Sequence, residues 1–306
     1  MNCSSKKISA LAPWALLLFL WGTVSLACNF PSVSAIPEEA FAVGETPLPP
    51  TAAAEIISAN PGLSGSRPRY APGELVDYIA QTGDTLPVLA LRFNTSVPEI
   101  RAANPFIPAS ATTMPPGMPM EIPIYYTPLW GSPYQIIPDS HFVNGPVQIG
   151  FNTVEFVDNH AGWLKNTVDF VGGRNLRGGQ IVDYVARNYS VSPRLLLALL
   201  EYQAGALSQP QVAPDVLEYP LGHRTWEYKD IYMQLVWAAN FLNNGYYAWR
   251  TGDMLEITLR DGRLERFDPW QNAATASLHH YFNFLLDAET YERAISPEGL
   301  AKVYAE

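Results

Sequence analysis

Two short segments of the chain carry residue types whose spacing could support acid catalysis or ligand binding. In the first, the carboxylic acid Glu201 follows a long apolar run. Burial against apolar side chains raises the pKa of a carboxyl group, which can then stay protonated near neutral pH and act as a general acid. In the second, the run Gly83-Asp84-Thr85-Leu86 precedes a helical pattern, and Asn104-Pro105 ends a later one. Backbone amides and carbonyls in such tight turns can hydrogen-bond a polar ligand, so this segment suits binding.

The residues before Glu201 predict a central, buried helix. Ser192 suits the N-cap and Pro193 the first helical position, while Gly205 suits the C-cap. Residues 195–200 are all Leu or Ala, and a helix that is apolar on every side belongs in the core. The helix therefore places Glu201 at the edge of the core, just after the buried apolar run.

This stretch resembles the catalytic helix of lytic transglycosylases, enzymes with a lysozyme-like fold that cleave β-1,4 glycosidic bonds of peptidoglycan. The segment 231–235 is similar to their Gly-Leu-Met-Gln element. The resemblance implies a mainly α, lysozyme-like domain over residues 150–306, with Glu201 as the general acid. With Gly205 held in register, however, Gln203 takes the place of the family's acid, and Glu201 lies on another face of the helix. Because Gln cannot donate such a proton, a domain that keeps the fold without cleavage is the alternative.

Aromatic and amide side chains near this helix are expected to line a cleft, because aromatic faces stack on sugar rings. The cleft candidates are Tyr202, Gln203, Tyr219, Trp226 and Gln234. Farther along the chain, residues 255–267 alternate in polarity around Asp261-Gly262, which predicts a β-hairpin in the same domain.

The second segment lies in a βααβ pattern. A short strand ends at the Gly83 turn, and Asp84 or Thr85 can cap the helix that follows. Pro98 suits the first turn of a second helix, and a last short strand ends near Ile122-Pro123. The pattern therefore predicts a small α+β module.

This order closely resembles a LysM domain over residues 76–124. The matching positions are Tyr78, Gly83-Asp84-Thr85-Leu86, Phe93, Val97, Ile100, Asn104-Pro105, Gly117 and Ile122-Pro123. LysM modules bind N-acetylglucosamine-containing glycans such as peptidoglycan or chitin, between the first turn and the loop after the second helix. The resemblance implies a glycan site made of Gly83, Asp84, Thr85, Leu86, Asn104 and Pro105. For each residue alone, the alternative is that it only shapes a turn or caps a helix.

The N-terminus has the features of a targeting segment. Lys6 and Lys7 precede an apolar run, and residues 1–27 together predict a secretory signal. The exit resembles a bacterial lipoprotein signal, in which Cys28 becomes the lipidated first residue. Ordinary signal cleavage and an uncleaved membrane anchor are the alternatives. All three place the remaining chain outside the cytoplasm, with a membrane contact through the lipid in the first case.

Composition bounds the rest of the architecture. The chain has 306 residues, 27 of them proline, and a net charge of −10, which argues against binding nucleic acid. Pro-rich stretches predict linkers at residues 28–75 and 125–149. His279 and His280 lack the spacing of a zinc helix, and no motif indicates a metal or another cofactor. We therefore expect a multidomain chain: the βααβ LysM module, then the mainly α, lysozyme-like domain with its β-hairpin.

Three functions remain open for such a bacterial cell-envelope protein. In the first, the LysM module binds peptidoglycan and the helical domain is non-catalytic. In the second, the helical domain is a lytic transglycosylase or muramidase that uses Glu201. In the third, it binds a protein partner.

Overall fold

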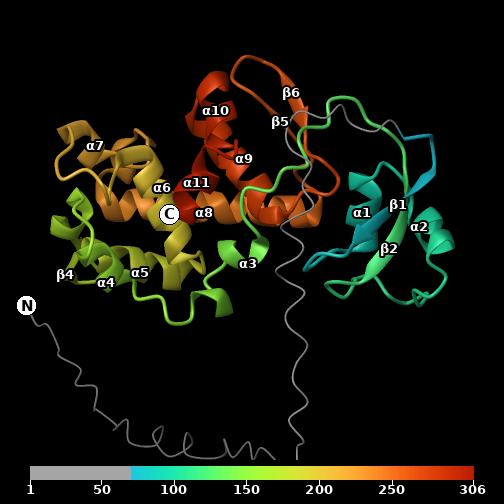
Figure 1. Cartoon of the computed structure of the whole chain (residues 1–306), viewed down its shortest axis with the longest axis horizontal. Coiled ribbons are helices and arrows are strands. Elements are labelled where there is room, and N and C mark those ends of the chain that lie inside the picture. The colour runs from blue at the N-terminus through green and yellow to red at the C-terminus, as the bar shows by residue number, and fades with distance from the viewer. Residues whose placement is uncertain (1–69) are drawn as a thin grey trace, which may run out of the picture. The chain divides into compact units, whose positions relative to one another are not determined.

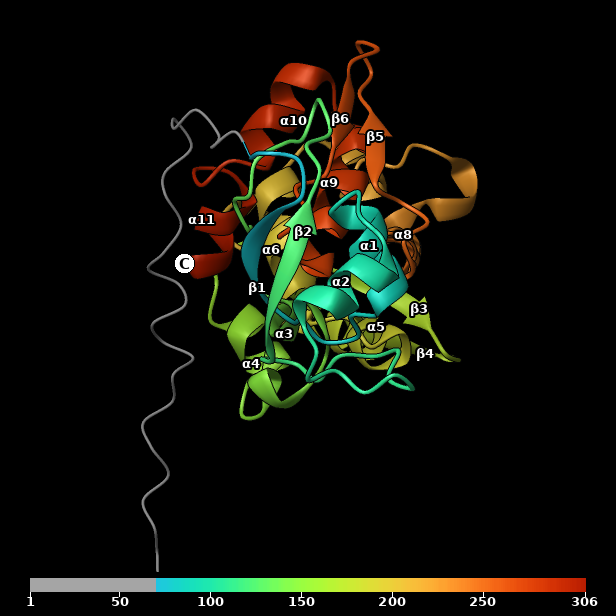
Figure 2. The same cartoon turned by 90° about the vertical axis from the view of Figure 1, so that its right-hand side faces the viewer.

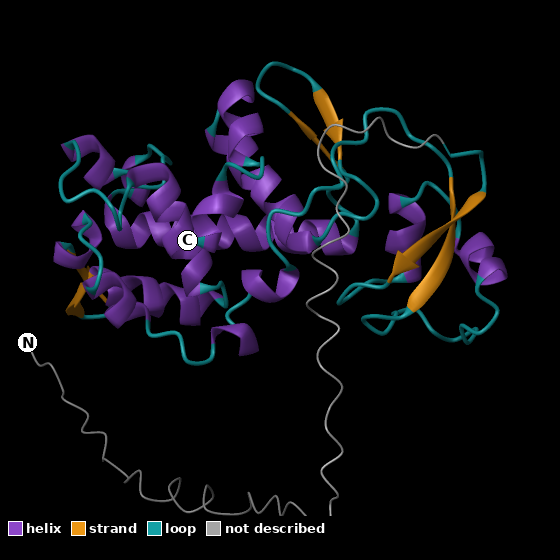
Figure 3. Ribbon diagram, viewed as in Figure 1, coloured by secondary structure: helices purple, strands orange, loops and turns teal. Residues whose placement is uncertain are grey.

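The computed structural model describes residues 70–306. The predicted signal segment, Cys28 and most of the predicted linker 28–75 lie outside these residues. By their contacts, residues 70–306 all belong to one compact unit. Figure 3 shows that strands and helices share the first part of the described chain, whereas helices dominate after it. Within residues 70–306, no helix is both long and apolar enough to cross a bilayer.

The first part has the predicted βααβ order. Strand β1 (Glu74–Ile79) pairs antiparallel with β2 (Pro119–Ile124), and helices α1 (Leu86–Arg92) and α2 (Val97–Ala103) lie between them in the chain. Figures 1 and 2 show the two strands side by side with both helices next to them. The core of this part is formed by buried residues that include Leu89, Phe93, Ile100, Ile122 and Ile124. These apolar side chains fix the small sheet against the helices and so position the two loops at its ends.

Capping residues set where the two short helices begin. The Thr85 hydroxyl accepts a hydrogen bond from the first turn of α1, and Ser96 and Glu99 form a capping box at α2. Each helix also carries a proline in its first turn, where the missing N–H costs no helical hydrogen bond. The cap at Thr85 therefore fixes the end of the Gly83 turn.

The second part is mainly α-helical. Its elements are α3 (Asp139–Phe142), the 3-10 turn η3 (Pro146–Gln148), α4 (Thr153–Asp158), η4 (Trp163–Asn166), β3 (Val168–Val171), β4 (Arg174–Arg177), α5 (Gly178–Tyr189), α6 (Pro193–Ala204), α7 (Pro214–Glu218), η5 (Trp226–Tyr228), α8 (Asp230–Thr251), β5 (Glu256–Thr258), β6 (Leu264–Arg266), α9 (Ala273–Leu285), α10 (Ala288–Ala294) and α11 (Leu300–Ala305). The prediction of a mostly helical second part is confirmed.

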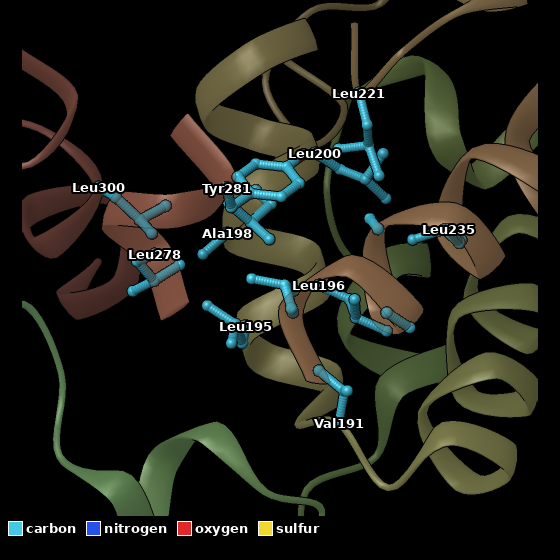
Figure 4. Packing of buried hydrophobic residues seen from close by; sticks show 14 of the residues in the cluster. Val191, Leu195, Leu196, Ala198, Leu200, Leu221, Leu235, Leu278, Tyr281 and Leu300 are labelled. Atoms are coloured by element: carbon cyan, nitrogen blue, oxygen red, sulfur yellow. The ribbon is translucent and has the colours of Figure 1, made fainter. Parts of the chain in front are cut away.

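Helix α6 is the central helix that the sequence predicts. Ser192 caps it by accepting from the Leu195 N–H, Pro193 is its first residue, and Gly205 ends it at φ +55°. Residues 195–200 are all buried. In Figure 4 their side chains meet those of α8 and α9, including Leu235, Leu278 and Tyr281. The apolar run thus forms the middle of the core, and its polar end carries Glu201.

The second part contains two hairpins, one more than expected. Strands β5 and β6 form the predicted hairpin, with Gly262 at φ +87° in its turn. Strands β3 and β4 form another. Its turn consists of Gly172 and Gly173, which both have positive φ. The short strands that flank this turn were not predicted from the sequence.

The predicted linker at 125–149 differs in the structure. Ile136, Ile137 and Phe142 are buried in the core of the helical part. The Ile136 N–H also donates to the Thr275 hydroxyl of α9 (2.9 Å). This segment therefore packs as part of the helical region. The prolines that suggested a linker lie on either side of residues that are buried in the core.

Candidate functional site

The Gly83 turn is held in place by buried Asp84. Its Oδ2 accepts hydrogen bonds from the Tyr78 hydroxyl (2.6 Å) and the Gln81 N–H (2.7 Å), while its Oδ1 accepts from Arg92 (2.9 Å). Burial raises the pKa of the Tyr78 phenol, which therefore stays a hydrogen-bond donor. Because Asp84 is only 3% exposed, its side chain shapes the turn from within.

Two loops of this part are tied to each other by their backbones. The Leu86 N–H donates to the Thr112 carbonyl (3.0 Å), and the Met114 N–H donates to the Asp84 carbonyl (3.0 Å). The side chain of Leu86 is buried in the core. The turn and the later loop thus form one connected surface, whose shape depends on backbone hydrogen bonds.

Asn104 plays the same structural role in the second loop. Its Nδ2 donates to the carbonyls of Ile100 (2.7 Å) and Glu121 (2.6 Å), and its Oδ1 accepts from the Glu121 N–H (3.0 Å). The side chain is 1% exposed, while Pro105 beside it is exposed. Asn104 therefore links the end of α2 to β2 and turns the following residues towards solvent.

The surface that a ligand can reach on these loops differs from the predicted set. Gly83 and Thr85 are partly exposed, and the exposed positions of the two loops include Thr82, Pro105, Phe106, Thr112 and Thr113. Phe106, at 61% exposure, is the large apolar side chain among them. The sequence analysis missed Phe106, although an aromatic residue directly after Asn104-Pro105 is a signal for sugar stacking.

The module is fastened to the helical part beneath the same turn. Arg92, which pairs with Asp84, also donates to the Trp249 carbonyl (3.2 Å), and its guanidinium lies 4.2 Å from the centre of the Trp249 ring. The Trp270 Nε1 donates to the Asp77 carbonyl of β1 (3.0 Å). Arg92 therefore holds the turn through its buried ion pair with Asp84 and also binds the end of α8.

Glu201 opens onto a pocket of about 560 Å³ in the helical part. The pocket is lined by Phe151, Phe156, His160, Arg194, Leu197, Ala198, Glu201, Leu207, Ser208, Val303, Tyr304, Ala305 and Glu306. The Oε2 atom of Glu201 accepts hydrogen bonds from the backbone N–H groups of Leu207 (2.7 Å) and Ser208 (3.1 Å). One carboxylate oxygen thus anchors the loop after α6, which is a structural use of the predicted acid.

Gln203 and Gln234 turn away from this pocket. Gln203 accepts from the Tyr281 hydroxyl (2.7 Å) and donates to the Leu221 carbonyl (3.3 Å). Buried Gln234 accepts from the Leu221 N–H (3.1 Å) and donates to the Tyr228 carbonyl (2.6 Å). Both glutamines therefore fix the loop between α7 and α8 against the core.

The remaining cleft candidates are not gathered around Glu201. Tyr202 contacts Phe282 edge to face, with ring centres 5.7 Å apart. Tyr219 is half-buried, and Trp226 is 79% exposed. None of the five candidates lines the Glu201 pocket, whose aromatic walls are Phe151 and Phe156 together with Tyr304.

The fold and the two joined loops define the first part as a LysM module, and residues 78–123 match the family model of the LysM domain. LysM domains bind peptidoglycan and related N-acetylglucosamine glycans, which supports peptidoglycan binding by this chain. Residues 135–306, more than half of the chain, match the family model described as LasA, N-terminal domain. The chain therefore belongs to the family of the LasA N-terminal domain.

The match to the helical part bears on the lysozyme-like prediction. The model that matches is that of the LasA N-terminal domain, so the resemblance to lytic transglycosylases gains no support from it. No curated protein and no solved structure shows significant similarity to the chain.

Proposed function

We propose that this chain is a peptidoglycan-binding protein of the bacterial cell envelope. Its LysM loops make the contact, with Gly83 and Thr85 offering backbone groups and Phe106 an aromatic face. The observation that carries the proposal is the pair of loops tied by backbone hydrogen bonds, with the side chains of Asp84 and Asn104 buried and the outer positions of the loops exposed. Such a surface meets an acetamido group with backbone groups and covers the sugar ring with apolar ones.

The segment before the LysM module fits this role. Residues 1–27 act as a secretory signal in this proposal, and Cys28 carries the lipid that holds the chain at the membrane. The residues between Cys28 and strand β1 then connect the membrane to the glycan-binding module. Labelling of cells with a radioactive fatty acid tests the anchor, because a Cys28→Ser variant would then lose the label.

A sedimentation assay with insoluble peptidoglycan tests the binding proposal. The chain without residues 1–28 should pellet with the polymer, and Phe106→Ala should weaken binding. Phe170→Ala is the matched control, because Phe170 is 67% exposed and Phe106 is 61% exposed, but Phe170 lies on β3. Equal binding by the two variants would remove Phe106 from the site, and a chain that stays in the supernatant would contradict the proposal.

We propose further that the helical domain has a non-catalytic role at the cell wall. The observation that favours it is the internal use of the polar groups at the end of α6: Gln203 bonds Tyr281 and Leu221, and an oxygen of Glu201 bonds two backbone N–H groups. A general acid must instead reach the glycosidic oxygen with a free proton.

Cleavage by Glu201 is the second candidate, favoured by the aromatic pocket onto which it opens. Digestion of purified peptidoglycan, with released fragments analysed by mass spectrometry, decides between the two. Release by the wild type and its loss in Glu201→Gln would establish catalysis. No release by the wild type would support the non-catalytic role.

A further inference from the structure

The turn of the LysM module lies against a cation from the helical domain. Gly83 has φ +83°, and a Cβ atom at this position would overlap the guanidinium of Arg250. Arg250 lies in the last turn of α8, directly after the Trp249 that binds Arg92. The guanidinium of Arg250, from the helical domain, therefore fills the space that a side chain at Gly83 would take.

Arg250 is not neutralised by an ion pair within residues 70–306. Its guanidinium lies 5.5 Å from the centre of the Tyr246 ring, and the nearby Arg92 is already paired with Asp84. The positive charge of Arg250 favours the ionised form of Asp139, but burial has the larger effect and raises the pKa of this carboxyl. Asp139 also accepts a hydrogen bond from the Ala274 N–H. Arg250 itself is partly exposed. A partly exposed guanidinium thus keeps donor capacity for a further acceptor.

The negative net charge of the chain makes the position of the positive Arg250 important for binding an anionic polymer. The whole chain carries −10, so an anionic polymer is repelled on average. A guanidinium beside the turn offsets that repulsion locally and offers planar donors that match a carboxylate.

We propose that Arg250 adds a carboxylate-binding position to the LysM turn. The combined site then takes amino-sugar glycans that bear carboxylates, as peptidoglycan does on its peptide stems and on those lactyl groups that carry no stem, in preference to neutral chitin oligomers. This inference rests on the proposed glycan binding by the LysM loops. It assigns the choice between acidic and neutral glycans to a residue outside the LysM module.

Calorimetric titration of the chain without residues 1–28 tests the assignment. The three ligands are a neutral chitin tetramer, a peptidoglycan tetrasaccharide without peptide, and the same tetrasaccharide with its stem peptides. For the wild type, we expect tighter binding of the acidic ligands, with the preference falling as salt is added. Arg250→Gln should lower affinity for an acidic ligand by up to about fivefold and leave the chitin tetramer unchanged. Arg250→Lys should retain part of the preference.

Arg187→Gln is the matched control, because Arg187 is an exposed helical arginine on α5. An effect with the peptide-free glycan assigns the carboxylate to the lactyl group, and an effect that needs the peptide assigns it to the stem. Both results support the proposal. An acid-to-neutral affinity ratio that is the same in the wild type and Arg250→Gln would overturn it. A wild type that binds none of the three ligands would instead overturn glycan binding itself.

Discussion

Buried polar side chains serve different ends in the two parts of the molecule. In the LysM module, Asp84 and Asn104 are buried, yet each holds a loop whose backbone and neighbouring residues stay exposed. In the helical part, Gln203 and Gln234 hold a loop against the core, while Glu201 remains beside a pocket with one oxygen already engaged. A polar residue that a motif assigns to a site can therefore shape the loop from within while its neighbours form the exposed surface.

The largest effect should come from breaking the buried pair of the LysM module. In Asp84→Ala, Arg92 keeps its charge in a buried position without a carboxylate, since the two side chains are 3% and 2% exposed. We expect a loss of about 3–5 kcal/mol in the free energy of unfolding, measured by urea denaturation. Asp183→Ala, which removes the partner of exposed Arg187, should cost at most about 1 kcal/mol. Similar losses in both variants would contradict the structural role of Asp84.

A smaller loss should follow from breaking the core contact of the helical part. Gln203→Leu leaves the Tyr281 hydroxyl and the Leu221 carbonyl without their partner. We expect a cost of about 1–3 kcal/mol in the same denaturation experiment, because buried polar groups lose their hydrogen bonds. The double variant with Tyr281→Phe should cost less than the sum of the single changes. Strict additivity would show that the two side chains do not interact.

Glu201→Ala should have a smaller effect again. It removes the acceptor for the Leu207 and Ser208 N–H groups, which lie next to solvent and can bind water instead. We expect a cost of about 1 kcal/mol, with Glu201→Gln closer to the wild type because its amide oxygen still accepts. Thermal unfolding of the three proteins measures this order. A Glu201→Gln variant as unstable as Glu201→Ala would show that the negative charge itself is required.

The smallest expected effect depends on pH and lies in the LysM module. Hydrogen bonds from Tyr125 first, then from Ser96 and Thr95, lower the pKa of Glu99 to about 2. A carboxyl whose pKa is lower in the folded state stabilises that state above its ordinary pKa, and this stabilisation is lost as the pH falls towards 2. Urea midpoints measured from pH 6 down to about 2 should therefore fall less for Glu99→Gln than for the wild type. Parallel curves would contradict the role of Glu99.

Local signals made much of the fold predictable. Thr85, Ser192, Pro193 and Gly205 determine their helix ends through neighbours within one turn, so the sequence is sufficient to place them. The apolar run of α6 likewise predicts its burial. The β3–β4 hairpin was missed because its strands have four residues each and expose Val168 and Phe170, so they lack a strong alternating pattern.

Contacts between distant segments could not be predicted in the same way. Gln203 meets Tyr281, and Gly83 meets Arg250, only after the helices have packed. Asp84 and Asn104 of the predicted glycan site are buried in the two loops, and a motif cannot tell a buried bracing side chain from an exposed contact. Burial decides that distinction, and it depends on the whole fold.

The decisive measurement for glycan binding by the LysM module is sedimentation of the chain without residues 1–28 with insoluble, purified peptidoglycan. The fraction that sediments with the polymer should be large for the wild type and should fall when soluble N-acetylglucosamine oligomers compete for the LysM loops. Protein that remains in the supernatant at every peptidoglycan concentration, although folded by circular dichroism, would contradict glycan binding by the module.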